Sequence, residues 1–162
     1  MNTFLTYSEK SKLYELIATN PKLLPLLPRF GIQLGFGDRS VDEVCRQNHI
    51  STRLFLQVCL LHLDHDTSTR MTAPDDADLD SLLTYLSASH RAYLDEHFPH
   101  IEMHLSRIIE AAGPKYGNML EHFYNEYKRE MVKHFKYEDE VVFPYIAALR
   151  QGRNTDYSID QF

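Results

Sequence analysis

The chain lacks the features that mark membrane-spanning, secreted and nucleic-acid-binding proteins. No apolar run approaches the roughly 18 residues that a membrane-spanning helix needs. The N-terminal residues show no charged start followed by an apolar core, so no secretory signal is predicted. Basic residues are fewer than acidic ones, 17 against 23. The formal net charge of −6 and the pI of about 5.8 argue against general binding to nucleic acids or anionic membranes.

Cysteine is also scarce, since Cys45 and Cys59 are the whole complement. A single pair in a chain without an export signal is expected to be reduced rather than disulfide-bonded, which predicts a cytoplasmic protein. Both lie on predicted helices, where inert packing is the expected role. The length of 162 residues, with 43% hydrophobic and 25% charged residues, is typical of about one globular domain.

Residues 1–66 are predicted to form a small helical leader domain. Apolar residues at helical spacing open it, and Asn20-Pro21 ends the first helix. The prolines that follow keep the next helices short. Ser40, with Glu43 three residues later, has the signature of a capping box at the start of a further helix.

A polar segment at 67–78 is the predicted linker, and 79–162 is the predicted helical hairpin. Asp78 or Asp80 is the expected cap of its first helix, and the Gly-Pro stop in 111–115 separates it from the second. Each helix of about 33 residues would be about 50 Å long. Two such helices bury too little apolar surface to be stable alone, and bundles of this kind use four. The predicted fold class is therefore all-α.

His134 and Glu138 are the most informative residues of the second helix. Four residues apart, they lie on one helical face, where an imidazole nitrogen and a carboxylate can reach the same point. That donor pair suits iron, and also zinc or manganese. The surrounding face is apolar, and a buried carboxylate is costly unless it is paired or bound to a metal.

The hairpin brings other histidines to the same height. With the turn near residue 115, His90 lies 25 residues before it and Glu138 lies 23 after, while His97 lies 18 before and His134 lies 19 after. In an antiparallel pair, equal distances from the turn mean equal heights. The sequence therefore predicts a metal site that contains His90, His134 and Glu138.

His97 and His104 are further candidate ligands. They follow His90 at intervals of seven residues, a spacing that drifts only about 20° per step and keeps all three on one stripe. His97 could equally pack in the interior or orient the ligands. An inward histidine is more often a hydrogen-bonded core residue than a ligand, so the joint placement carries the prediction.

At these residues the chain resembles the hemerythrin-like (HHE cation-binding) proteins, and in particular the di-iron repair-of-iron-centres family. The match lies at Ser89-His90 and at 133–146, Lys-His-Phe-Lys-Tyr-Glu-Asp-Glu-Val-Val-Phe-Pro-Tyr-Ile. The family's motif of a His, then H-x-x-x-E and Phe-Pro, falls on His90, His134, Glu138 and Phe143-Pro144. The resemblance implies a non-haem di-iron centre, dioxygen or nitric oxide as a small ligand, and a role in nitrosative or oxidative stress and iron–sulfur centre repair.

The N-terminal region is similar to the family's small leader domain, at 16–32 and 40–45. The family usually has adjacent cysteines after this Phe-Gly-Ile, whereas here 33–37 read Gln-Leu-Gly-Phe-Gly. Cysteine chemistry is therefore not expected in the leader.

The resemblance also implies a second His…His-x-x-x-Glu half, which would begin where this chain ends. The expectation is half of a hemerythrin-like four-helix bundle, belonging either to a longer protein or to an assembly of two chains. A two-fold homodimer would supply two each of His90, His134 and Glu138, with the glutamates bridging two metals. Whether the protein turns over a substrate is left open.

Two other interpretations fit parts of the sequence. Residues 40–62 have a helix-turn-helix rhythm, with Arg53 and Gln57 as would-be base-reading groups of a DNA-binding regulator. Residues 1–70, however, carry eight basic against seven acidic residues, a net of +1, and phosphate binding needs more. The remaining interpretation is a dimerising helical scaffold that has lost its site.

Overall fold

A computed structural model describes residues 8–63 and 73–153 of the chain. Within these ranges the regular elements are all helical, and the described residues contain no β-strand, which confirms the predicted all-α class. No helix in the described ranges is long and apolar enough to cross a membrane. The chain divides into two compact units, Met1–Ala88 and Ser89–Phe162.

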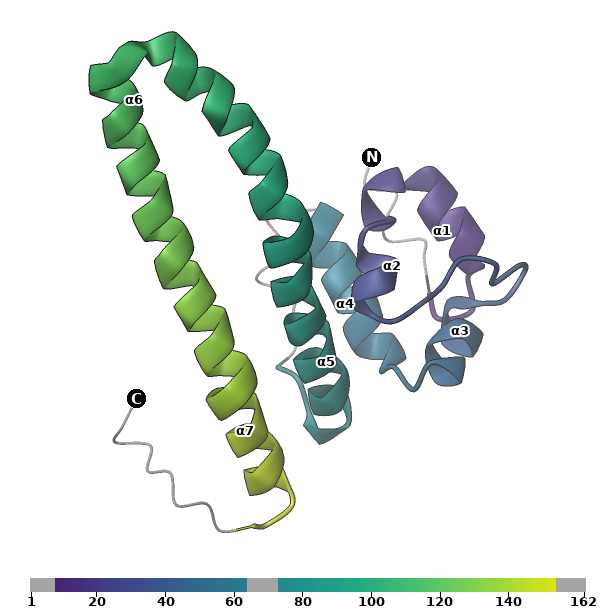
Figure 1. The fold of residues 1–162 in the computed structure, drawn as a ribbon. Helices are drawn as coiled ribbons and strands as arrows, with labels where there is room; N and C mark the ends of the chain where they lie inside the picture. Colours follow the sequence, from purple (N-terminus) through teal and green to yellow (C-terminus); the bar gives the residue numbers. More distant parts are fainter. Residues whose placement is uncertain (1–7, 64–72, 154–162) are drawn as a thin grey trace. The chain divides into compact units, whose positions relative to one another are not determined.

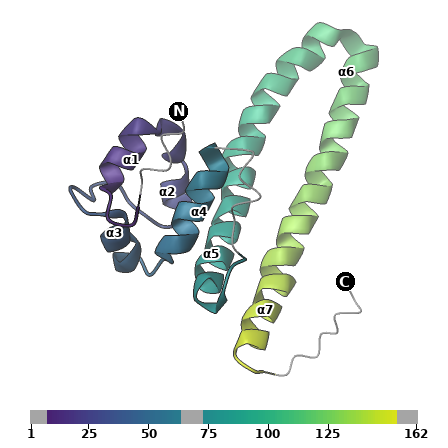
Figure 2. The same cartoon turned by 180° about the vertical axis from the view of Figure 1, so that it is seen from behind.

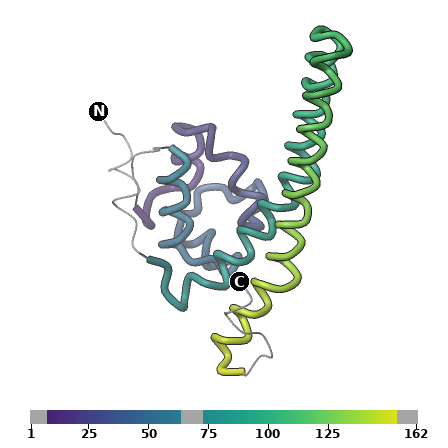
Figure 3. Tube along the Cα trace, turned by 90° about the vertical axis from the view of Figure 1, so that its left-hand side faces the viewer, coloured from purple at the N-terminus to yellow at the C-terminus, as the bar shows by residue number. Residues whose placement is uncertain are grey.

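The first unit gathers short helices around one apolar core (Figures 1 and 3). Its elements are α1 (Leu13–Thr19), a 3-10 turn (Pro21–Leu23), α2 (Leu26–Arg29), α3 (Val41–Gln47), α4 (Thr52–Leu63) and the first turns of α5 (Asp76–Ala92). In this core the ring of Phe30 lies 5.2 Å from that of Phe55 and 4.6 Å from that of Tyr85. The predicted capping box is confirmed, because Ser40 and Glu43 bond each other's backbone N–H at the start of α3.

Cys45 and Cys59 are free thiols buried in this core. Burial raises the pKa of Cys45 to about 12 and also raises the pKa of Cys59. Neither side chain is therefore disposed to form the reactive thiolate, as the expected packing role requires.

Helix α5 begins at Asp76, earlier than predicted. Its N-cap is Asp75, whose carboxylate accepts hydrogen bonds from the N–H groups of Ala77 and Asp78 at 3.0 and 3.2 Å. Asp78 accepts the N–H of Asp75 in return, at 3.1 Å. The expected cap at Asp78 or Asp80 is therefore wrong, because a reciprocal capping box built from two aspartates starts the helix one turn earlier. The rest of the predicted linker lies largely outside the described residues.

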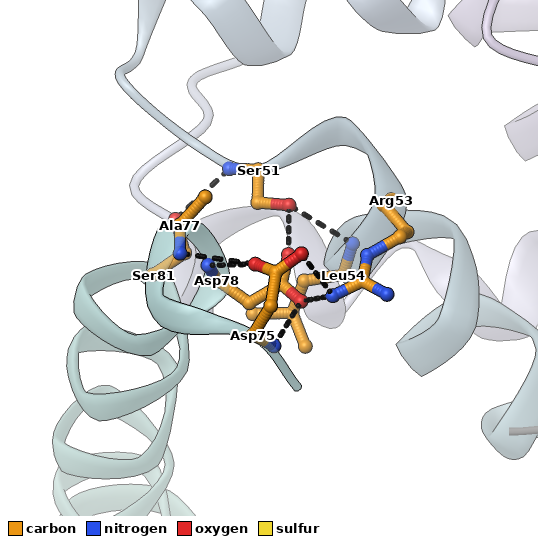
Figure 4. Close-up of polar contacts among 7 residues, drawn as sticks. All are labelled: Ser51, Arg53, Leu54, Asp75, Ala77, Asp78 and Ser81. Atoms are coloured by element: carbon orange, nitrogen blue, oxygen red, sulfur yellow. Dashed lines mark hydrogen bonds and ion pairs between the residues drawn. The ribbon is translucent and has the colours of Figure 1, made fainter. Parts of the chain in front are cut away.

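Asp78 also ties α5 to α4, as Figure 4 shows. It is buried, accepts a hydrogen bond from the Ser51 hydroxyl and pairs with Arg53, while the Ser51 N–H donates to Ser81 at 2.9 Å. Burial opposes ionisation of Asp78, but its bonds from Ser51, the Asp75 N–H and Arg53 outweigh it and lower the pKa of the carboxyl.

The second unit is a hairpin of two long helical arms (Figures 1 and 2). Its elements are the end of α5, the π-helical segment η4 (Tyr93–His97), α6 (Phe98–Tyr137), the π-helical segment η5 (Glu138–Val142) and α7 (Phe143–Arg150). The chain reverses within α6 at Gly113, whose φ of 75° is open to glycine at little cost. The predicted antiparallel hairpin is confirmed, with its turn two residues before the expected centre.

Both π-helical segments are followed directly by Phe-Pro. Proline lacks a backbone N–H, and its ring collides with the carbonyl four residues earlier, so a regular α-helix cannot run through Pro99 or Pro144 undisturbed. A π turn immediately before each proline takes up that disturbance. The second arm thus passes Pro144 through a widened helical turn.

The two arms bury few of their side chains against each other. Among the described residues of this unit, the buried apolar side chains are aromatic: Phe98, Tyr124, Phe135 and Phe143. Many large apolar side chains remain exposed, including Ile101, Ile108, Met119, Phe123 and Tyr127. The hairpin therefore carries an apolar surface that its own two arms do not cover.

Candidate metal centre

His90 is held in the seam between the two arms. Its side chain is only 8% exposed. The imidazole stacks on Phe135 with centroids 4.3 Å apart and the planes 14° from parallel, and it also stacks on Phe143 at 5.7 Å. Phe143 belongs to the Phe143-Pro144 dipeptide, which contributes both the ring that packs on His90 and the proline that follows the π turn.

Glu138 lies between two imidazoles. Its Oε2 is 3.1 Å from Nε2 of His90 on the opposite arm, and its Oε1 is 3.5 Å from Nε2 of His134 one turn earlier on the same arm. The three residues singled out from sequence therefore come together through this carboxylate. Exposure of the side chain rises from 8% for His90 to 29% for Glu138 and 58% for His134, so the cluster opens outward.

Asp139 faces the other nitrogen of His90, a neighbour that the sequence does not predict. Its Oδ1 is 3.2 Å from Nδ1, but Nδ1 is buried and makes no hydrogen bond of acceptable geometry. A carboxylate that receives the free N–H of a histidine fixes the tautomer and orients the other nitrogen. The available signal was the acidic residue directly after Glu138 on the same turn.

The π-helical segments were also missed, although they lie at this site. Glu138 and Asp139 open η5, and Tyr93 of η4 packs on Phe135 with centroids 5.8 Å apart. Single π turns within α-helices occur often at functional sites, because they turn side chains out of the regular helical register. The two Phe-Pro dipeptides were the signal in the sequence.

His97 and His104 lie in a different place. Both are exposed, and together with His100 they line a groove whose other walls are Ile101, Leu105 and Ile108. That lining contains neither His90 nor Glu138. The ring of His97 is 5.0 Å from Tyr93. Their membership of the centre stays a prediction.

The cluster is smaller than a complete metal site. In the two ranges that the structure describes, no three or more histidine, cysteine, aspartate or glutamate side chains are grouped so as to hold a metal ion. What the chain presents is a carboxylate with one imidazole at each oxygen. Imidazole and carboxylate are ligands for iron, manganese and zinc, and further donors would have to complete the coordination.

Arg53 and Gln57, the side chains expected to read DNA bases, make contacts within the protein. The guanidinium of Arg53 pairs with Asp75, at 3.0 Å, and with the buried Asp78. The side-chain oxygen of Gln57 is buried. Two carboxylates therefore stand at the start of α4, where a recognition helix would approach phosphates, and the helix-turn-helix alternative gains no support.

Fold and site together define an all-α protein whose long hairpin presents two histidines around a glutamate. The chain is 22% identical, over 156 residues, to the iron-sulfur cluster repair protein ScdA of Staphylococcus haemolyticus, a match that covers 94% of this chain and 69% of that protein. It is 25% identical, over 97 residues, to ScdA proteins of Staphylococcus epidermidis, covering 59% of this chain and 43% of theirs. No protein-family model matches the chain. No solved structure matches it either.

Proposed function

We propose that this protein binds non-haem iron as a di-iron centre and serves in the response to nitrosative or oxidative stress, by the repair of iron–sulfur centres. The single observation that carries the metal-binding part is the carboxylate of Glu138 with an imidazole nitrogen 3.1 and 3.5 Å from its two oxygens. The distant similarity to iron-sulfur cluster repair proteins supports the physiological role. The buried thiols Cys45 and Cys59 fit a reducing compartment, the cytoplasm.

The residues present fit iron by their chemistry. His90 offers a nitrogen in a dry, fixed position, and its buried Nδ1 needs a partner that Asp139 can provide. With Nδ1–H donated to that carboxylate, Nε2 is left with its lone pair toward the centre. Glu138 would hold iron through its carboxylate, and zinc or manganese would suit the same donors.

Half of such a site is supplied by one chain, and we propose that a second copy supplies the rest. His134 is 58% exposed and lies on the same helical face as Met119 and Phe123, which are 65% and 69% exposed. An apolar face with a metal ligand at one end fits a two-fold homodimer, in which the same surfaces meet. Two copies would provide two each of His90, His134 and Glu138.

In this arrangement the chain's own residues act in separate ways. Phe135 and Phe143 hold the imidazole of His90 and exclude water from one side of it. His134 lies at the open side, where a small ligand such as dioxygen or nitric oxide would arrive. Iron, when bound, would supply an open coordination position and access to two oxidation states.

The test replaces one ligand on the exposed side. His134→Ala should abolish the optical bands and the bound metal of the iron-loaded protein, with the helical circular dichroism unchanged because His134 is largely exposed. His122→Ala, which removes an exposed histidine of the same arm, is the matched control and should retain both. Retention of bands and metal by the His134 variant would refute the assignment.

A further inference from the structure

A second set of histidines lies outside the proposed centre, on the first arm of the hairpin. His100 and His104 are four residues apart on α6, and their rings stack with centroids 4.9 Å apart and planes 28° from parallel. Both side chains are exposed, and they line a groove of about 470 Å³ together with His97 and three apolar residues. His104 is also a predicted ligand of the centre, but the structure groups it with His100 and not with His90 and Glu138.

We propose that His100 and His104 form a separate surface site for a divalent transition-metal ion. Two histidines at i and i+4 lie on one face of a helix, a spacing with which helices bind zinc. The rings are already side by side, so side-chain rotation alone would turn one nitrogen of each toward a common ion. Water would complete the coordination, since no third protein ligand is grouped with them among the described residues.

The helix should give this pair a higher affinity for a metal ion than scattered surface histidines have. After the first imidazole binds the ion, the second is held within reach by the backbone, so its binding is an intramolecular step. Imidazole nitrogen also selects the kind of ion. Affinity should rise from Mn²⁺ to Ni²⁺ and Cu²⁺, while Mg²⁺ and Ca²⁺, which prefer oxygen ligands, should not compete.

The π-helical segment explains why this site is distinct from the centre. Spacing alone places His90 and His104 on one stripe, but η4 (Tyr93–His97) lies between them. An extra residue in a helical turn rotates the residues after the turn by about 100° relative to the residues before it. His104 accordingly pairs with His100 in the groove, whereas His90 faces Glu138.

The experiment uses the full chain with the proposed centre removed by His134→Ala and Glu138→Ala. Titration of NiCl₂ into this background, followed by calorimetry, should show one Ni²⁺ bound per chain. Adding His100→Ala or His104→Ala should weaken that binding about 100-fold, because each removes the second arm of the chelate. The two single replacements should be equally harmful, and the pair together little worse than either.

The matched control is His122→Ala in the same background, an exposed histidine of the other arm whose neighbour Glu126 is paired with Arg129. It should leave Ni²⁺ binding unchanged. Nickel affinity that survives loss of His100 and His104, or that falls equally in the control, would overturn the proposal. Because the centre is absent from every variant, either result leaves the iron proposal untouched.

Discussion

His90 combines the surroundings of a core residue with an unsatisfied polar atom. Two phenylalanine rings stack on its imidazole, and its buried Nδ1 lies 3.2 Å from Asp139 without a hydrogen bond. Packing thus fixes the ring before any ligand arrives, which lowers the ordering cost of binding. The pair of phenylalanines is therefore expected to matter for both stability and ligand geometry.

Replacing Phe143 by alanine should show the effect on stability. Phe143 is buried, so the metal-free protein should lose about 3–5 kcal/mol of unfolding free energy, through lost apolar burial and the cavity left beside His90. Urea denaturation followed by circular dichroism measures it. Leu149→Ala, at a half-exposed position of the same helix, should change stability by less than about 0.5 kcal/mol. Similar losses in the two variants would contradict the packing described for His90.

Asp78 gives the first unit a pH dependence with a definite sign. Its pKa is lowered in the folded state, so the unfolded chain binds more protons around the ordinary value of about 3.9. The stabilisation that the ionised Asp78 carboxylate gives is complete above the unfolded-state pKa. It is lost as the pH falls through the lower pKa of the folded state. Because Arg53 is partly exposed and screened, Asp78→Asn should cost only about 1–3 kcal/mol at pH 7.

Urea denaturation of wild type and Asp78→Asn from pH 7 to pH 3 tests this directly. The difference in unfolding free energy between wild type and Asp78→Asn should stay constant down to about pH 5 and then decrease below about pH 4. Asp38→Asn, at an exposed position of the same unit, should show no gap at any pH. A gap as large at pH 3 as at pH 7 would mean that the charge of Asp78 is not what stabilises the α4–α5 contact.

At this scale the sequence predicted the close approach of His90, His134 and Glu138, because helical spacing and a hairpin turn suffice to place them. Asp139 could not be singled out, since its closeness to Nδ1 depends on how the η5 turn is wound. The expected cap of α5 at Asp78 or Asp80 is wrong for a similar reason. Several aspartates follow one another there, and which of them caps depends on the buried contact with Ser51 and Arg53.

Among the elements, the two π-helical segments position the site. Each precedes a Phe-Pro, and each brings the phenylalanine into the seam between the arms, where Phe98 and Phe143 are buried. Helical spacing in the sequence predicts where the arms run. Regular helical spacing does not allow for the extra residue of a π turn. The side chains before and after η4 are therefore rotated relative to one another, compared with their positions in a regular helix.

The turn end of the hairpin depends on a close approach between the arms. Gly117 is buried, and a Cβ atom there would lie 2.9 Å from the Ile109 carbonyl oxygen. Alanine would favour the helix by about 1 kcal/mol, but displacing a backbone oxygen should cost about 1–3 kcal/mol, so Gly117→Ala should be neutral to destabilising. Asn118→Ala, at an exposed position, should instead stabilise slightly.

Thermal denaturation of the two variants, monitored by circular dichroism, separates these effects. We expect the midpoint of Gly117→Ala to lie below that of Asn118→Ala. A Gly117→Ala protein that melts above the Asn118 variant would show that the arms are not in contact at this level. The sequence placed the Gly-Pro turn but offered no means of finding this contact, which arises from the packing of the two arms.

For the whole molecule, the central question is what covers the exposed apolar side of the hairpin. Met119, Phe123 and His134 share one helical face, and all three are largely exposed. Two isolated helical arms with so few buried side chains are marginal in water, so a partner surface should contribute much of the stability. The proposed second copy would cover this face and complete the ligand set in one step.

The surface can be tested without touching a ligand. Phe123→Glu would place a charge in the proposed interface, and burying it unpaired would be costly, so the variant should sediment as a monomer and lose its iron. Lys115→Glu, which introduces the same carboxylate side chain at an exposed position near the turn, should remain a dimer with iron bound. Loss of dimer or iron in both variants would show that the effect is not specific to this face.

The most direct test is the mass and the iron content of the freshly purified chain, measured on one sample by sedimentation velocity and elemental analysis. We predict a particle of two chains that contains two iron ions, because two half-sites together hold the di-iron centre. A folded monomer with bound iron, or a dimer without any metal, would contradict it.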